Sequence, residues 1–183
     1  MTDFGASSYH RYLQGDSSAL EDLVREYGDT LVRFCYSFLN DYYSAEDVME
    51  ETFATLIVKR KKFSERAKFK TYLFKIARNK CIDILRSRNR TVELNDNLND
   101  LLSDSPESTA LLSDRNKQLY KCMLLLPEAY RQVLILVYFE DFSVEETGKV
   151  LYKNRKQIYN LLSRARASLK EILIKEGINS ENI

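Results

Sequence analysis

One stretch near the carboxyl-terminal end restricts the possible folds more than any other. Residues 142–173 read FSVEETGKVLYKNRKQIYNLLSRARASLKEIL. Ser143 and Glu146 have the spacing of a capping box, and Asn154 can cap a second helix after a short break. One face of this second helix is apolar and consists of Ile158, Leu161, Leu162, Ala165 and Leu169. The pattern predicts a helix-turn-helix, in which Gly148 lets the second helix approach closely.

The opposite face of the second helix is hydrophilic and carries Lys156, Asn160, Ser163, Arg164 and Lys170. Amide and cationic groups can hydrogen-bond to base edges in a DNA major groove, and Lys and Arg neutralise phosphates. A helical hairpin with a solvated basic face fits the same pattern, because this spacing occurs in many small helical proteins. Both interpretations of this stretch remain open on its residues alone.

The composition predicts an all-α protein. The 183 residues include only 5 Gly and 2 Pro, and Leu, Lys, Glu and Arg are plentiful. The length suits one or two domains. No apolar run approaches the roughly 20 residues that span a bilayer, and the first residues lack a basic, apolar leader. We therefore expect no membrane insertion and a cytoplasmic location.

Few residues are available for metal or nucleophilic chemistry. Cys35, Cys81 and Cys122 are far apart in the sequence and form no C-x-x-C pattern, which favours unpaired thiols over a metal site or a structural disulfide. His10 is the only histidine. A His-rich metal site and a Ser-His-Asp triad are therefore not expected, and we predict no cofactor, no metal and no catalytic residues.

The net charge of +1 conceals strong segregation of charge. Residues 1–58 hold 3 basic residues and 11 acids, whereas residues 59–90 hold 13 basic residues and 2 acids. Residues 91–114 hold 6 acids and no Lys or Arg, and residues 153–183 hold 7 basic residues and 3 acids. Two basic surfaces are thus predicted on either side of an acidic spacer, which is most simply a flexible tether.

Two further helices are predicted in the first half of the chain. Ser17 or Ser18 can cap the first, and Ser44 can cap the second. The second begins with four acids, Glu46, Asp47, Glu50 and Glu51. These acids can complement the helix dipole, but like charges four residues apart repel each other and indicate a surface kept for a basic partner. Metal ligation by these carboxylates is a third interpretation.

Residues 59–90 interleave aromatic and basic side chains, a pattern typical of single-stranded nucleic-acid binding. The rings offer stacking platforms for bases, and the cations follow the backbone. Phe69 or Phe74 is expected to belong to the core, whereas Phe63 and Tyr72 are expected to contact bases.

Three segments resemble the extracytoplasmic-function sigma factors of bacterial RNA polymerase. SAEDVMEETFATL, residues 44–56, and YLFKIARNKCIDILRSRNR, residues 72–90, resemble their second region. LLLPEAYRQVLILVYFEDFSVEETGKVLYKNRKQIYNLLSRARASL, residues 124–169, resembles their fourth. The resemblance implies two small helical domains, residues 1–90 and 114–183, joined by a flexible acidic linker at residues 91–113, with the helix-turn-helix in the second domain.

The resemblance also implies a role for each group of residues. The polymerase-binding residues, which would meet the clamp helices of the β′ subunit, are Glu46, Asp47, Glu50 and Glu51. The minus-ten residues, which would hold flipped bases and the edge of the melted DNA, are Phe63, Arg66, Lys68, Phe69, Lys70, Thr71, Tyr72, Asn79, Asp83, Arg86 and Arg88. The minus-thirty-five residues, which would meet the duplex, are Asn154, Arg155, Lys156, Gln157, Asn160 and Arg164. The β flap and promoter DNA are further implied partners, and an anti-sigma factor is a possible one. The resemblance also leaves two roles open for the acidic linker: a simple tether, or a segment that lies in the active-site channel and RNA exit path of the polymerase.

The sequence departs from the family pattern in the helix-turn-helix. Tyr152 stands where the turn usually has Gly, so we expect either a looser turn or a left-handed conformation at a non-Gly residue. Tyr159 and Leu161 stand where the family often has basic residues. Upstream, residues 119–126 and 127–138 are predicted to be helices, with Pro127 in a first turn.

Three functions compete at this point. The first is a non-enzymatic alternative sigma factor, whose first domain melts the promoter and whose second recognises duplex. The second is a self-sufficient helix-turn-helix regulator of duplex operators, which has no need for an acidic partner face or a basic aromatic segment. The third is a nucleic-acid enzyme with Asp47, Glu50 and Glu51 as metal ligands, although no His or nucleophile accompanies them.

Overall fold

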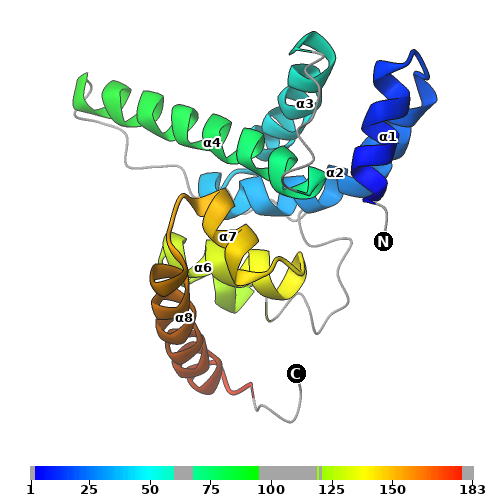
Figure 1. Cartoon of the computed structure of the whole chain (residues 1–183). Coiled ribbons are helices and arrows are strands. Elements are labelled where there is room, and N and C mark those ends of the chain that lie inside the picture. Colours follow the sequence, from blue (N-terminus) through cyan, green and yellow to red (C-terminus); the bar gives the residue numbers. More distant parts are fainter. Residues whose placement is uncertain (1–2, 60–67, 95–118, 120, 179–183) are drawn as a thin grey trace. The chain divides into compact units, whose positions relative to one another are not determined.

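The computed structural model describes residues 3–59, 68–94, 119 and 121–178. The chain divides into two compact units, unit 1 at Met1–Ser103 and unit 2 at Asp104–Ile183. Every regular element in the described ranges is a helix (Figure 1). The prediction of an all-α chain with two small helical domains is therefore confirmed. The exact domain borders and the linker at residues 91–113 stay predictions.

Unit 1 consists of four helices: α1 (Phe4–Leu13), α2 (Ser18–Leu39), α3 (Tyr42–Lys59) and α4 (Phe69–Leu94). The long helix α2 packs against each of the other three. Its apolar stripe forms the centre of the core, where Leu23, Leu31, Phe34 and Cys35 are fully buried. A hydrogen bond with Cys81 of α4, together with burial, raises the pKa of the Cys35 thiol.

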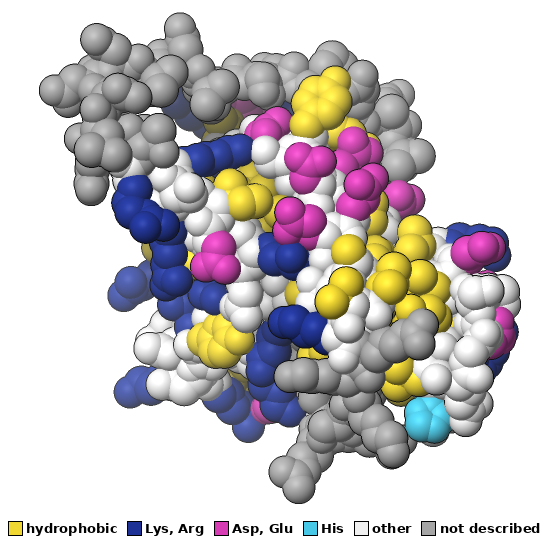
Figure 2. All heavy atoms as spheres, turned by 90° about the horizontal axis from the view of Figure 1, so that it is seen from above, with side chains coloured by type: hydrophobic (Ala, Val, Ile, Leu, Met, Phe, Trp, Pro, Cys, Tyr) yellow, Lys and Arg dark blue, Asp and Glu magenta, His cyan; other side chains and the backbone are white. Residues whose placement is uncertain are grey.

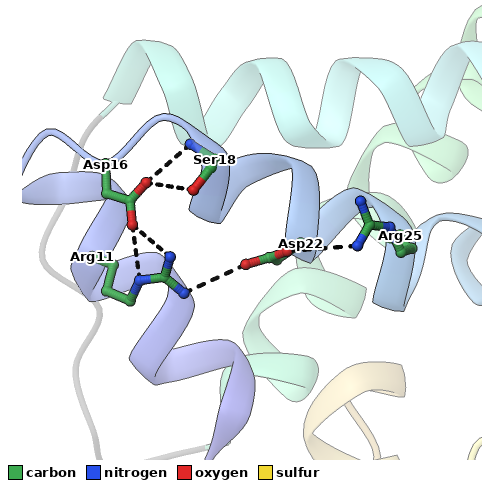
Figure 3. Close-up of polar contacts among 5 residues, drawn as sticks. All are labelled: Arg11, Asp16, Ser18, Asp22 and Arg25. Atoms are coloured by element: carbon green, nitrogen blue, oxygen red, sulfur yellow. Dashed lines mark hydrogen bonds and ion pairs between the residues drawn. The ribbon is translucent and has the colours of Figure 1, made fainter.

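Aspartate side chains accept hydrogen bonds at the starts of both α2 and α3. Asp16 Oδ1 accepts hydrogen bonds from Ser18, while Asp16 Oδ2 accepts from Arg11 Nε at 2.9 Å (Figure 3). Ser17 makes no capping bond with its side chain. Asp41, not Ser44, serves α3, because its carboxylate accepts from the Ser44 backbone N–H at 3.3 Å. Ser17 thus occupies the cap position predicted for α2, but its side chain makes no capping bond. The Ser44 cap expected for α3 is wrong, because Asp41 takes that place.

Unit 2 contains a helical segment at residues 121–124, then α6 (Glu128–Leu134), the π-helix η2 (Ile135–Phe139), α7 (Val144–Leu151) and α8 (Arg155–Lys175). Pro127 takes the cap position of α6 rather than a place in its first turn. The helices α6 and α8 pack together, and Ile158, Leu162 and Ala165 of α8 are buried. No helix among the described residues is both long and apolar enough to cross a membrane.

Candidate nucleic-acid and protein interfaces

The turn between α7 and α8 is fixed at both ends by capping boxes. Ser143 and Glu146 form one, and Asn154 and Gln157 form the other. Between them Tyr152 adopts the left-handed conformation, with φ 54° and ψ 45°. The expected helix-turn-helix is present, and a non-Gly residue closes its turn. A Cβ on Gly148 would lie 2.6 Å from the Lys153 carbonyl oxygen, so the close approach is made by the turn rather than by α8 itself.

The outer face of α8 presents hydrophilic groups without internal partners. Lys156, Asn160 and Arg164 are exposed, and none of them forms a side-chain hydrogen bond or an ion pair within the described part of the chain. They lie four residues apart and therefore on one side of the helix. Asn154 and Gln157 are also exposed, but the capping box occupies their side-chain oxygens and leaves their NH₂ groups as donors.

Arg155 is held by two neighbours in this part of unit 2. Its guanidinium lies 3.4 Å from Glu145 Oε1 and donates to the Tyr159 hydroxyl at 3.3 Å. The same guanidinium stacks 5.5 Å from the centre of the Tyr159 ring. The hydrogen bond to Tyr159, followed by the charge of Glu145, raises the pKa of Arg155. Arg155 is therefore oriented before any ligand arrives.

The helix α4 and its cap residue, Lys68, carry the described part of the predicted minus-ten set. Lys68, Asn79, Asp83 and Arg86 are exposed, whereas Lys70 and Tyr72 are half-buried. Arg86 pairs with Asp83 at 3.7 Å. Phe63 and Arg66 lie outside the described residues.

Arg88 at the far end of α4 has structural partners. Its Nη2 donates to Ser44 Oγ at 2.7 Å and to Asp41 Oδ2 at 3.5 Å. Ser44 in turn hydrogen-bonds to Asp41. This network ties α4 to the first turn of α3, so the guanidinium predicted to contact DNA is already engaged within unit 1.

Phe69 and Thr71 belong to the interior of unit 1. Phe69 has no exposed surface, and its ring centre lies 5.3 Å from that of Tyr9 and 6.1 Å from that of Tyr27. Thr71 is 2% exposed. The reason is helical geometry: Phe69, Leu73, Phe74 and Ala77 all face the core. The side chains of Phe69 and Thr71, both predicted to contact DNA, are therefore buried in unit 1, and Phe74 is part of the core as well.

The acidic residues of α3 form a face of their own. Asp47, Glu50 and Glu51 are exposed, and Glu46 is half-buried. Lys80 of α4 donates to Glu51 Oε2 at 2.8 Å. Figure 2 shows acidic side chains gathered next to hydrophobic ones, with most Lys and Arg side chains elsewhere on the visible surface. Among the described residues no group of three His, Cys, Asp or Glu could hold a metal ion.

Unit 2 also has an apolar groove of about 440 Å³ between α8 and the preceding helices. Leu134, Tyr138, Leu169 and Leu173 are among its lining residues. Arg166 stands at its edge, where its guanidinium lies 5.5 Å from the centre of the Tyr138 ring. The groove is apolar enough to receive hydrophobic side chains of another protein.

Comparison with known proteins agrees with this division into units. Residues 23–91 match the family model for sigma-70 region 2, and residues 116–169 match that for sigma-70 region 4. The chain is 28% identical over 171 residues to the ECF RNA polymerase sigma factor SigW of Bacillus subtilis, covering 87% of this chain and 91% of SigW. It is 29% identical over 163 residues to SigM of the same organism, covering 88% of this chain and 99% of SigM.

The chain is an extracytoplasmic-function sigma factor. Its fold is similar to that of the sigma factor RpoE in its complex with the anti-sigma factor NepR from Bartonella quintana, with a TM-score of 0.69 and 26% identity over 84% of this chain and 97% of that one. CnrH, solved with the cytosolic domain of CnrY, shares the fold with a TM-score of 0.68 at 23% identity, over 94% of this chain and 99% of CnrH.

The sigma factor contains several functional candidates that sequence reasoning missed. Glu145 and Asp41, which hold Arg155 and Arg88, were not predicted as partners. The helix α1 was not predicted at all, and it lies outside the region that matches the family model. Charge alternation between neighbouring elements is the only sequence signal that could have suggested the two pairs.

Proposed function

We propose that this alternative sigma factor, which acts in transcription initiation, has no catalytic activity of its own and acts in the cytoplasm on core RNA polymerase. Unit 1 would bind the β′ clamp helices through Asp47 and Glu50 and hold the opened minus-ten strand through α4. Unit 2 would recognise the minus-thirty-five duplex. The observation that best supports this proposal is an exposed row on the second helix of the helix-turn-helix, Lys156, Asn160 and Arg164, which has no side-chain partner among the described residues.

Two protein partners complete the proposal. The apolar groove of unit 2 is where we place the polymerase β flap, because its lining side chains offer a hydrophobic surface beside the DNA-reading helix. An anti-sigma factor is the other proposed partner, supported by the similarity to RpoE, which was solved with NepR.

The polymerase contact can be tested by charge reversal at Glu50. Glu50 is exposed, so Glu50→Lys should reduce affinity for core polymerase by about tenfold or more while leaving the fold intact. Glu51→Lys is a less selective variant, because it also breaks the ion pair with Lys80. Affinity is measured by fluorescence anisotropy of labelled sigma factor titrated with core enzyme. Equal affinity of Glu50→Lys and the wild type would refute the contact.

The duplex contact can be tested on unit 2 separately. Lys156→Ala combined with Asn160→Ala should impair promoter binding by the holoenzyme but not assembly with core polymerase. Lys175→Ala, at the last residue of α8, is the matched control for loss of a cation. Transcription from a genomic fragment library supplies the promoters. Unchanged promoter binding by the double variant would contradict the assigned face.

A self-sufficient operator-binding regulator predicts a different outcome. Such a protein would occupy duplex sites tightly without polymerase, and Glu50→Lys would not affect its activity. Family membership favours the sigma factor, and so does the exposed acidic face of α3, for which an operator-binding regulator has no use. Duplex binding by the free chain, compared with binding by the holoenzyme, distinguishes the two.

A further inference from the structure

A single carboxylate near the amino terminus joins the starts of two helices in unit 1. Asp3 Oδ1 accepts a hydrogen bond from the Ala6 backbone N–H at 3.3 Å and so caps α1. Asp3 Oδ2 accepts from the Phe69 backbone N–H at 2.7 Å, and Phe69 is the first residue of α4. The two partners of this carboxylate are 63 positions apart in the sequence, and each oxygen serves one helix.

The start of α4 needs a side-chain acceptor from elsewhere, because the side chain of its own cap residue has none. The Lys68 carbonyl accepts the first intrahelical bond, from Tyr72 N–H at 3.2 Å, which places Lys68 at the cap position. A lysine side chain carries only donors, so it cannot itself accept from the first N–H groups of the helix. Asp3 supplies both the missing acceptor and a negative charge at the positive end of the helix dipole.

Close packing holds α1 in the position from which Asp3 reaches α4. A Cβ on Gly5 would lie 2.5 Å from Phe69 Cδ1 and 2.7 Å from the Tyr27 hydroxyl oxygen, so only glycine fits there. Tyr9 of α1 is 1% exposed and packs against the Phe69 ring. Phe69, the first residue of α4, is therefore held in two ways: its backbone N–H donates to Asp3, the cap of α1, and its ring packs against Tyr9 of α1.

The turn held in this way carries side chains assigned above to the opened DNA strand. Lys68, the cap residue of α4, is exposed, and Lys70 and Tyr72 in the first turn of α4 are half-buried. We propose that Asp3 is a positioning residue for promoter opening, which fixes this turn so that Lys68, Lys70 and Tyr72 meet the minus-ten strand in one geometry. The proposal rests on the proposed function of unit 1. It assigns a role to a residue outside the region matched by the family model.

Asp3→Asn separates the two bonds of the carboxylate. Asparagine caps helices about as well as aspartate, so the amide oxygen can still serve α1. Its NH₂ group would face the Phe69 N–H, donor against donor, and the bond to α4 would be lost. Asp3→Ala removes both bonds. Asp16→Asn is the matched control, because Asp16 joins Arg11 of α1 to the start of α2 (Figure 3) and forms no hydrogen bond or ion pair with the described residues of α4.

The first readout is the hydrogen exchange of the Phe69 amide in the full-length free protein. A hydrogen bond to a charged group suggests that Asp3→Asn lowers its protection about tenfold, whereas Asp16→Asn leaves it unchanged. Unchanged protection of Phe69 in Asp3→Asn would overturn the structural half of the proposal.

The second readout is strand opening by the holoenzyme, followed by permanganate reactivity of thymines in a promoter that the wild type transcribes. We expect Asp3→Asn to reduce the opened fraction severalfold at unchanged affinity for core polymerase and for promoter duplex. Equal opening by Asp3→Asn and the wild type would overturn the role of Asp3 alone. A wild-type holoenzyme that opens no genomic promoter would overturn the proposed function as well.

Discussion

Replacing Gly148 with alanine should damage the helix-turn-helix even though alanine favours helices. Gly148 is buried in α7, and an added Cβ would lie 2.6 Å from the Lys153 carbonyl oxygen. That carbonyl cannot easily move. Lys153 N–H donates to the Gly148 carbonyl at 2.9 Å, and Asn154, the next residue, belongs to the capping box of α8.

The size of the effect follows from three terms. Overpacking of a rigid site costs about 1 to 3 kcal/mol. Opening the turn to relieve the clash loses a hydrogen bond worth about 1 kcal/mol. The greater helix propensity of alanine returns about 1 kcal/mol. Gly148→Ala should therefore lower the free energy of unfolding of unit 2 by about 1 to 3 kcal/mol.

Gly28 provides the matched control within the same chain. It lies inside α2, and the nearest atom to an added Cβ, Val24 Cγ1, is 3.9 Å away. Gly28→Ala should raise the stability of unit 1 by about 0.5 to 1 kcal/mol, because the substitution adds propensity without a clash. Urea denaturation followed by amide NMR signals reports each unit separately. If Gly148→Ala stabilised unit 2 as Gly28→Ala stabilises unit 1, the argument from the close approach would be refuted.

Three other predictions concern single side chains. Arg88→Ala should lower the stability of unit 1 by about 1 kcal/mol through loss of its bonds to α3, whereas Arg86→Ala, an exposed control, should change it little; urea denaturation measures both. Burial, and then the charge of Asp3, raises the pKa of Tyr27 to about 12. The stabilisation that results from this raised pKa is complete below about pH 10, the ordinary tyrosine pKa, and is lost as the pH rises to about 12. The free energy of unfolding of Tyr27→Phe should therefore fall less steeply over this pH range, which alkaline denaturation measures. Glu145→Gln should strengthen duplex binding and steepen its salt dependence by about one phosphate contact, because Arg155 loses an internal competitor; anisotropy titrations at several salt concentrations test this, and an unchanged slope would contradict it.

The parts of the fold that depend on local rules were predictable from the sequence. The capping boxes at Ser143 and Asn154 lie within three residues of their partners, so the start of each helix of the helix-turn-helix could be inferred correctly. The left-handed Tyr152 was one of two expected solutions for a turn without glycine. The apolar stripe of α8 followed from its periodicity, and Ile158, Leu162 and Ala165 are indeed buried.

The features that depend on distant partners were not predictable in this way. No helix was predicted over the segment that forms α1, and the position of α1 depends on Phe69, far along the chain. The sequence could not decide whether Phe69 packs in the core or contacts DNA, because an aromatic residue among cations is compatible with both. The caps at Asp16 and Asp41 were missed because aspartate and serine rank nearly equally as caps, and only geometry shows which one reaches the amides.

Distant partners also decide which basic side chains are available to bind DNA phosphates. Sequence charge treats every Lys and Arg of residues 59–90 as available to phosphate, but Lys80 and Arg88 are paired with Glu51 and Asp41 of unit 1. A phosphate contact by either cation must first replace an internal partner, which offsets part of the gain in binding free energy. These two pairs also connect α4 to the acidic helix α3, so removing either cation disturbs the proposed polymerase face together with the DNA face. The unpartnered cations of α8 carry no such coupling, and their substitution is therefore the cleaner measure of DNA recognition.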